Sequence, residues 1–304
     1  MLKSWLNVLQ TRWNSYKYRF VPWIAVNICK NERTLRQVPL CSLDKLVSDE
    51  EVLRSITKLF RALFSSNLGG QRDLLRMLSS SSQTNYQAAV GEEGPSDPGR
   101  VMFDTMGFAI ERRPSSLQSA GTGVFVVMGT VPKGTTVAMY PGTVYQKYEP
   151  IFFQSICNPF IFRCIDGVLI DGNDKGISKA VYRSCSGRDR LGPVKFSDTT
   201  WLTDEPYNPL AVGQYVNNCS NDKAANVCYQ EFDVPTGFPI ELCQYLPNVN
   251  YRMDMPSESE REIHPSSAAY LRRGREDACL SSDAQTSLSP EDSSREIPRC
   301  SQAI

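Results

Sequence analysis

The chain has 304 residues, with 33 basic and 33 acidic side chains and a hydrophobic fraction of 41%. This length allows one or two domains with a buried core, and the apolar content is typical of globular proteins. Zero net charge gives no general signal for nucleic acid as a partner, and no apolar run approaches the roughly 20 residues needed to span a membrane.

The residue types exclude several kinds of chemistry. The only histidine is His264, and it stands in a polar C-terminal tail. Ser-His-Asp triads, Cys-His pairs and H-E-x-x-H zinc sites all require imidazole, so the remainder of the chain has none of them. None of the ten cysteines forms a C-x-x-C pair, and we therefore expect no metal site. In the absence of a secretory signal, we expect reduced thiols and an intracellular location, in nucleus or cytoplasm.

The first 31 residues hold no acidic side chain. Trp5, Leu6, Leu9 and Trp13 recur there at helical spacing. Two interpretations stay open at this point. One is a helix that docks on the domain, and the other is a mitochondrial transit peptide, which would make the mitochondrion the alternative location.

The clearest predicted helix begins at Ser48, which forms a capping box with Glu51. Gly69 and Gly70 offer a stop for this helix, and a second short helix is expected over residues 72–78. One face of the first helix carries the apolar residues Val52, Leu53, Ile56, Leu59, Phe60, Leu63 and Phe64.

From Val101 the sequence becomes β-like. Residues 124–128, 135–140 and 161–170 are rich in branched and aromatic side chains and are separated by turns that contain glycine. The fold class expected for the chain is therefore mainly β with a helical N-terminal region, an α+β protein.

Composition divides the chain into four regions. Residues 1–78 are expected to be helical, and the Ser-, Gly- and Pro-rich residues 79–100 a linker or exposed loop. Residues 101–251 form the β domain. Residues 252–304 contain one aromatic side chain, Tyr270, and bury too little apolar area to offset the entropy of ordering, which predicts a disordered tail.

Three clusters in the β region could carry function. Gly121-Thr122-Gly123 precedes a strand, where glycine lets the backbone approach a ligand, although an ordinary turn has the same sequence. Tyr140-Pro141-Gly142 ends another strand. Asn217-Asn218-Cys219-Ser220 follows an apolar run and leads to Asn226 and Tyr229. Asparagine amides can bind a polar group through both donor and acceptor atoms, or simply stabilise a turn.

In this order and spacing the clusters resemble the SET domain of protein-lysine methyltransferases, from about Val101 to Tyr251. The family has G-x-G, then a strand ending in Y-x-G, then an N-H-S-C stretch followed by Asn and Tyr. Asn218 stands where the family has histidine.

The resemblance implies a SET-type β fold and a protein or peptide substrate that carries a target lysine. S-adenosylmethionine is the implied cofactor, bound by Gly121, Gly123, Asn217 and Asn218. The resemblance further implies that Tyr140 and Tyr229 are catalytic and line the lysine channel. It implies no metal, and it does not indicate the oligomeric state.

The chain departs from the family at its end. SET domains close with an acidic turn and a short strand that bears a tyrosine, and we find no such segment after Tyr251. The fold is therefore expected to be incomplete at its C-terminal end. Two functional hypotheses follow: a lysine methyltransferase whose activity in this chain depends on the missing segment, or a non-catalytic binding or regulatory variant.

A basic stretch falls where the family has a variable insert. We interpret it as a solvated loop, and a surface for an acidic peptide or nucleic acid is the alternative. Its basic residues are Lys175, Lys179, Arg183, Arg188, Arg190 and Lys195, and its acids are Asp174 and Asp189.

Overall fold

A computed structural model describes residues 46–78, 86, 97–116, 121–146, 149–156, 158–164, 168–218, 226–252, 266–272 and 298–299. Of Asn218 and of the last two ranges only the backbone is described. The predicted N-terminal amphipathic segment, and with it the transit-peptide question, lies outside these residues. No helix in the described part of the chain is long and apolar enough to cross a membrane.

The longest helix among the described residues, α3 (Asp49–Ser65), confirms Ser48 as the predicted N-cap. The Ser48 hydroxyl accepts a hydrogen bond from the Glu51 backbone N–H at 3.3 Å. The helix ends at Ser65, before the two glycines, which belong to a 3₁₀ turn, η1 (Leu68–Gln71). The second helix follows as α4 (Arg72–Met77). All the predicted face residues except Leu53 are buried.

Helix α6 (Pro98–Met106) occupies the point where we expected a linker to give way to β structure. The expected start of β structure at Val101 is wrong, because the first strand begins at Phe108. Asp97 caps the helix by accepting from Gly99 N–H and Arg100 N–H. Tyr86, in the same predicted linker, is buried and donates a hydrogen bond to Glu241 at 3.1 Å.

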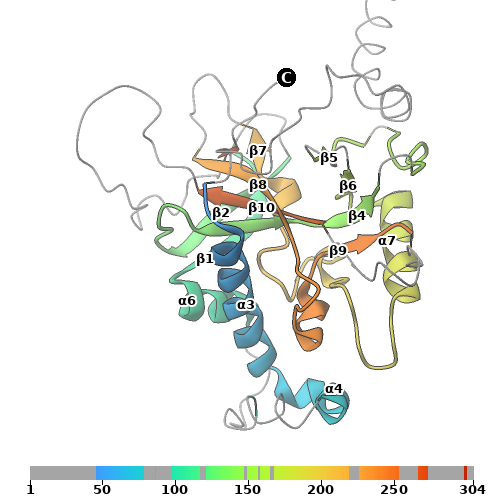
Figure 1. Cartoon of the computed structure of the whole chain (residues 1–304). Helices are drawn as coiled ribbons and strands as arrows, with labels where there is room; N and C mark the ends of the chain where they lie inside the picture. The colour runs from blue at the N-terminus through green and yellow to red at the C-terminus, as the bar shows by residue number, and fades with distance from the viewer. Residues whose placement is uncertain are drawn as a thin grey trace, which may run out of the picture.

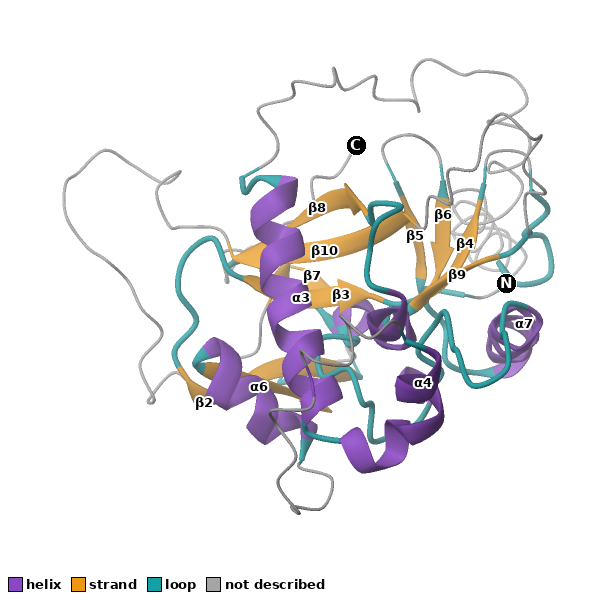
Figure 2. Cartoon of the chain, turned by 60° about the horizontal axis from the view of Figure 1, so that its bottom comes forward, coloured by secondary structure: helices purple, strands orange, loops and turns teal. Residues whose placement is uncertain are grey.

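The strands form three sheets among the described residues. Helices α3 and α6 pack against each other and lie to the left of the four-stranded sheet in both views (Figures 1 and 2). A two-stranded antiparallel sheet pairs β1 (Phe108–Pro114) with β2 (Thr122–Gly129). A four-stranded sheet has the order β5-β6-β4-β9. Its strands are β4 (Gly142–Tyr145), β5 (Ile161–Arg163), β6 (Leu169–Asp171) and β9 (Asn248–Asn250). The predicted strand over residues 161–170 is therefore the antiparallel pair β5 and β6.

The five-stranded sheet changes the interpretation of the C-terminal tail. Its order is β3-β10-β8-β11-β7, with β3 (Thr136–Tyr140), β7 (Asn217–Asn218) and β8 (Val227–Asp233) from the β domain. Two tail segments, β10 (Ser266–Arg272) and β11 (Pro298–Arg299), complete it. The prediction of a wholly disordered tail is wrong for these segments, and a strand does follow Tyr251. The register pairs Tyr270 with Ala138 on one side and Tyr229 on the other.

The basic stretch also differs from the prediction, because most of it is helix α7 (Gly176–Arg188) rather than a loop. Helix α7 buries Tyr182 and Cys185, and the Tyr182 ring packs edge-on against Trp201 at 4.9 Å between centroids. Trp201 belongs to a 3₁₀ turn, η2 (Thr200–Leu202). Two further 3₁₀ turns are η3 (Gly213–Tyr215) and η4 (Ile240–Tyr245).

The main hydrophobic core joins the N-terminal helix to the β region. Phe60 of α3 is fully buried and its ring lies 6.4 Å from that of Phe238 and 5.4 Å from that of Tyr245. The α+β class is thus confirmed. The division into four regions stays a prediction, although α3 packs into the same core as β3 and β8.

Candidate functional site

The first and third sequence clusters meet in the structure. Asn217, at the start of β7, donates from its side-chain amide to the Thr122 carbonyl at 3.1 Å and to the Ser115 hydroxyl at 3.3 Å. Ser115 N–H in turn donates to the Gly121 carbonyl at 2.8 Å. The Asn217 amide therefore ties the β7 segment to the backbone between the two predicted glycines.

The two glycines differ in their surroundings. Gly121 is exposed, has φ +70°, and a Cβ placed there would meet no atom within 4 Å, so its backbone faces open space. Gly123 is buried within β2, opposite Arg113 of β1. Asn218 follows Asn217 in β7, where its backbone pairs with Arg299. Gly121, Gly123 and Asn217 thus lie within one small region.

The two predicted catalytic tyrosines are brought together by a phenylalanine that sequence reasoning missed. The ring of Phe162, on β5, lies 5.1 Å from the Tyr140 ring and 4.1 Å from the Tyr229 ring, centroid to centroid. The Tyr140 hydroxyl donates to the Phe160 carbonyl at 2.7 Å, and the Tyr229 hydroxyl lies 3.6 Å from Cys164 Sγ. Tyr140 is 3% exposed and Tyr229 is partly buried. Strand β5 therefore forms one wall shared by both tyrosines.

The turn after Tyr140 is held by tertiary contacts. The Asn248 side chain donates to the Tyr140 carbonyl at 3.0 Å, and Gly142 N–H donates to the Pro247 carbonyl at 2.9 Å. Gly142 has φ +142°, and a Cβ there would lie 2.3 Å from the Asp171 carbonyl oxygen. Glycine is thus required at this position both by backbone conformation and by the close approach of β6.

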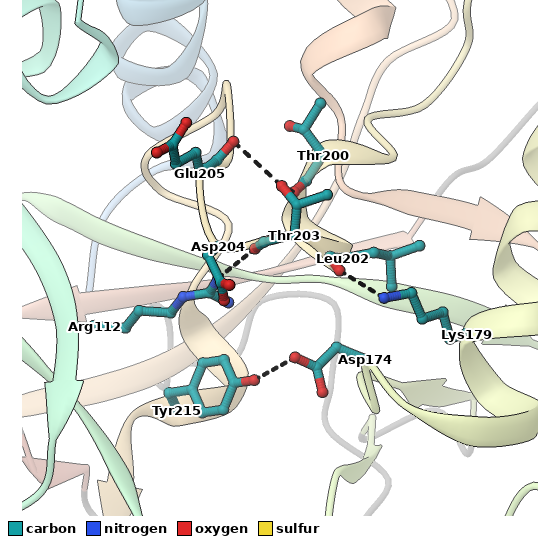
Figure 3. Close-up of polar contacts among 9 residues, drawn as sticks. All are labelled: Arg112, Asp174, Lys179, Thr200, Leu202, Thr203, Asp204, Glu205 and Tyr215. Carbon is teal, nitrogen blue, oxygen red and sulfur yellow. Dashed lines mark hydrogen bonds and ion pairs between the residues drawn. The ribbon is translucent and has the colours of Figure 1, made fainter.

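Tyr215, two residues before Asn217, belongs to a polar network that the sequence did not indicate (Figure 3). Its hydroxyl donates to Asp174 Oδ2 at 2.6 Å, and the Arg112 guanidinium lies 5.6 Å from its ring centroid. Arg112 also donates to the Thr203 carbonyl and pairs with Asp204 at 3.3 Å. Burial, assisted by the hydrogen bond to the carboxylate, raises the pKa of the Tyr215 phenol, which therefore stays protonated at neutral pH.

This network joins three parts of the fold. Arg112 comes from β1, Asp174 stands just before α7, and the Thr203–Asp204 segment follows η2. Lys179 of α7 adds a hydrogen bond to the Leu202 carbonyl at 2.9 Å. Together these contacts fix the chain immediately before β7, and so the position from which Asn217 reaches Thr122.

Comparison with known proteins gives close relatives. The chain is 62% identical over 266 residues to SET domain-containing protein 9 of Homo sapiens, an alignment that covers 83% of this chain and 89% of the relative. It is likewise 62% identical over 238 residues to SET domain-containing protein 9 of Pongo abelii, covering 74% and 87%. No family model and no solved structure matches the chain. Identity of this extent shows that the chain belongs to the SET domain-containing proteins, in the family of SET domain-containing protein 9.

Proposed function

We propose that this chain is an S-adenosylmethionine-dependent methyltransferase that acts on lysine side chains of proteins. The observation that carries the proposal is the hydrogen bond from Asn217 to the Thr122 carbonyl. This contact joins the two sequence clusters assigned to the cofactor by family resemblance. The aromatic cluster of Tyr140, Phe162 and Tyr229 forms a second group of the expected residue types.

The residues present fit a polar cofactor bound partly by backbone. Gly121 has no side chain and faces open space, so a ligand can come close to its main chain. Gly121, Gly123, Asn217 and Asn218 would hold the cofactor. When bound, S-adenosylmethionine supplies a methyl group activated by its attachment to a sulfonium.

The tyrosines would act on the incoming lysine. Burial next to a positive charge lowers the pKa of an amine and favours its neutral form, which is the nucleophile. Tyr140 and Tyr229 would orient this amine, so much of the rate would come from positioning. Their electron-rich rings would also stabilise the positive charge carried by the methyl donor. Tyr140 and Tyr229 would hold the neutral amine toward the methyl group that bound S-adenosylmethionine would supply, and the methylated nitrogen would release its extra proton to solvent.

Binding of S-adenosylmethionine to the purified full chain, measured by calorimetry, tests the first half of the proposal. We expect saturable binding that weakens at least tenfold in Asn217→Ala. Asn67→Ala is the matched control, because Asn67 lies in the turn after α3, outside the clusters assigned to the cofactor and the lysine. Thermal unfolding of both variants shows whether they are folded. A folded wild-type chain that binds no cofactor would refute the proposal.

A second assay tests methyl transfer itself. Labelled methyl groups from S-adenosylmethionine should enter protein in a cell lysate, and Tyr229→Phe should reduce that incorporation. Cofactor binding without any transfer would favour the alternative, a non-catalytic binding or regulatory protein. One observation supports this alternative: the Tyr140 hydroxyl already donates to the Phe160 carbonyl inside the protein.

A further inference from the structure

Gln214, in the middle of η3, is a buried polar residue that the proposed roles leave unused. It is 8% exposed. Among the described residues, neither its amide oxygen nor its amide nitrogen has a hydrogen-bond partner. A buried amide that makes no hydrogen bond typically destabilises a fold, so a position that keeps one needs a reason.

The surroundings of Gln214 indicate that reason. A Cβ placed on Gly172 would lie 2.8 Å from Tyr140 Cε1 and 3.2 Å from Gln214 Cβ, so both side chains pack against the same glycine. Gly172 N–H donates to the Phe160 carbonyl, the same oxygen that accepts the Tyr140 hydroxyl. Gln214 Cβ therefore lies within about 6 Å of Tyr140 Cε1, and the unpartnered amide belongs to this side chain.

Gln230 shows what a buried glutamine with a purely structural role looks like in this chain. It is 4% exposed. Its amide oxygen accepts from Leu46 N–H at 3.0 Å and from Val47 N–H at 3.3 Å, and its amide nitrogen donates to the Val47 carbonyl at 2.8 Å. Gln230 therefore uses both ends of its amide, whereas Gln214 uses neither.

We propose that Gln214 is a substrate-contacting residue whose amide oxygen accepts a hydrogen bond from the ε-amino group of the target lysine. This inference rests on the proposed function. A neutral amine offers two N–H donors and one lone pair, and the lone pair must face the methyl group during transfer. An acceptor beside Tyr140 would hold one N–H and so direct the lone pair. The amide oxygen gains a hydrogen-bond partner only in the substrate complex.

Gln214 should then lower the stability of the fold and raise its activity, so that replacing it has opposite effects on the two. Gln214→Met has similar length and no polar group, so it removes the unsatisfied amide. We expect its unfolding midpoint to rise by about 3 °C. Gln230→Met should instead lower the midpoint, because it leaves backbone groups of residues 46 and 47 without their partner. Methyl transfer by Gln214→Met should fall at least tenfold, with the dissociation constant of S-adenosylmethionine within twofold of wild type.

The experiment uses the full chain with labelled S-adenosylmethionine and a degenerate peptide pool with lysine at the centre. Gln214→Glu gives an independent readout, because a carboxylate beside the amine favours its protonated form. We expect the rising limb of its pH–rate profile to move to higher pH, a change that a merely structural role would not produce.

The outcomes are separable. A wild-type chain that neither binds the cofactor nor transfers methyl groups refutes the proposed function and this inference with it. A wild-type chain that is active, with Gln214→Met equally active and an unmoved pH profile for Gln214→Glu, overturns the inference alone. Loss of cofactor affinity in Gln214→Met also overturns it, since the amide would then contact the methyl donor.

Discussion

The hydrogen bond between Tyr215 and Asp174 gives a prediction whose size follows from the structure. The phenol donates to the carboxylate at 2.6 Å in a partly buried setting. Hydrogen bonds to charged groups contribute about 1.5–3 kcal/mol to stability. Because Asp174 keeps some access to water, we expect Tyr215→Phe to lower the free energy of unfolding by about 1–2 kcal/mol.

Urea unfolding of four chains would measure this value directly: wild type, Tyr215→Phe, Asp174→Asn and the double variant. If the two groups interact as the structure shows, the double-mutant cycle should give a coupling of about 1 kcal/mol. Tyr207→Phe is the matched control, since Tyr207 is 57% exposed, and its free energy of unfolding should stay within about 0.5 kcal/mol of wild type. A coupling near zero, with both single variants folded, would show that the Tyr215–Asp174 hydrogen bond does not stabilise the fold.

Three further predictions concern the core, a turn and a buried acid. Phe60→Ala should lower the free energy of unfolding by about 3–5 kcal/mol in urea titrations, because Phe60 is fully buried; a loss below about 1 kcal/mol would contradict the packing. Gly142→Ala should cost several kcal/mol, on the order of 3, since its Cβ would meet the Asp171 carbonyl at 2.3 Å, and a wild-type melting curve would count against this geometry. Burial raises the pKa of Asp198 to about 6, against about 3.9 for an unfolded chain. The folded state therefore binds the proton more tightly, and the contribution of Asp198 to stability is greatest below about pH 4 and is lost as pH rises through about 6. Relative to wild type, Asp198→Asn should gain on the order of 3 kcal/mol between pH 4 and pH 7, and parallel pH profiles of the two chains would exclude this effect.

Local signals accounted for some elements and missed others for identifiable reasons. Helix α3 was predictable because its capping box and its apolar face both lie within one short stretch of sequence. Helix α6 was missed because its Asp97 cap and Pro98 follow a Gly- and Pro-rich segment that resembles a loop. Helix α7 has no side-chain cap, and its stabilising contact, the packing of Tyr182 on Trp201, cannot be read from the helix itself.

The tail shows the limit of composition as a guide. Residues 252–304 carry few apolar side chains, which argues against a core of their own. Strand β10 nevertheless pairs on both sides, with β3 and β8, and so meets the hydrogen-bonding requirement of two strands that would otherwise have exposed edges. That requirement belongs to the backbone, so side-chain composition does not reveal it.

The sequence by itself indicated the family and the residues that are proposed to act in it. A single histidine excluded imidazole chemistry from the β region, and the ordered Gly, Tyr and Asn clusters indicated the family. Only the tertiary structure decided which residues meet: Phe162 between Tyr140 and Tyr229, Asp174 on Tyr215, and Tyr140 and Gln214 against Gly172. Such contacts join residues that are distant in the chain, and they depend on sheet register and on the packing of turns against strands, which no local pattern of residues encodes.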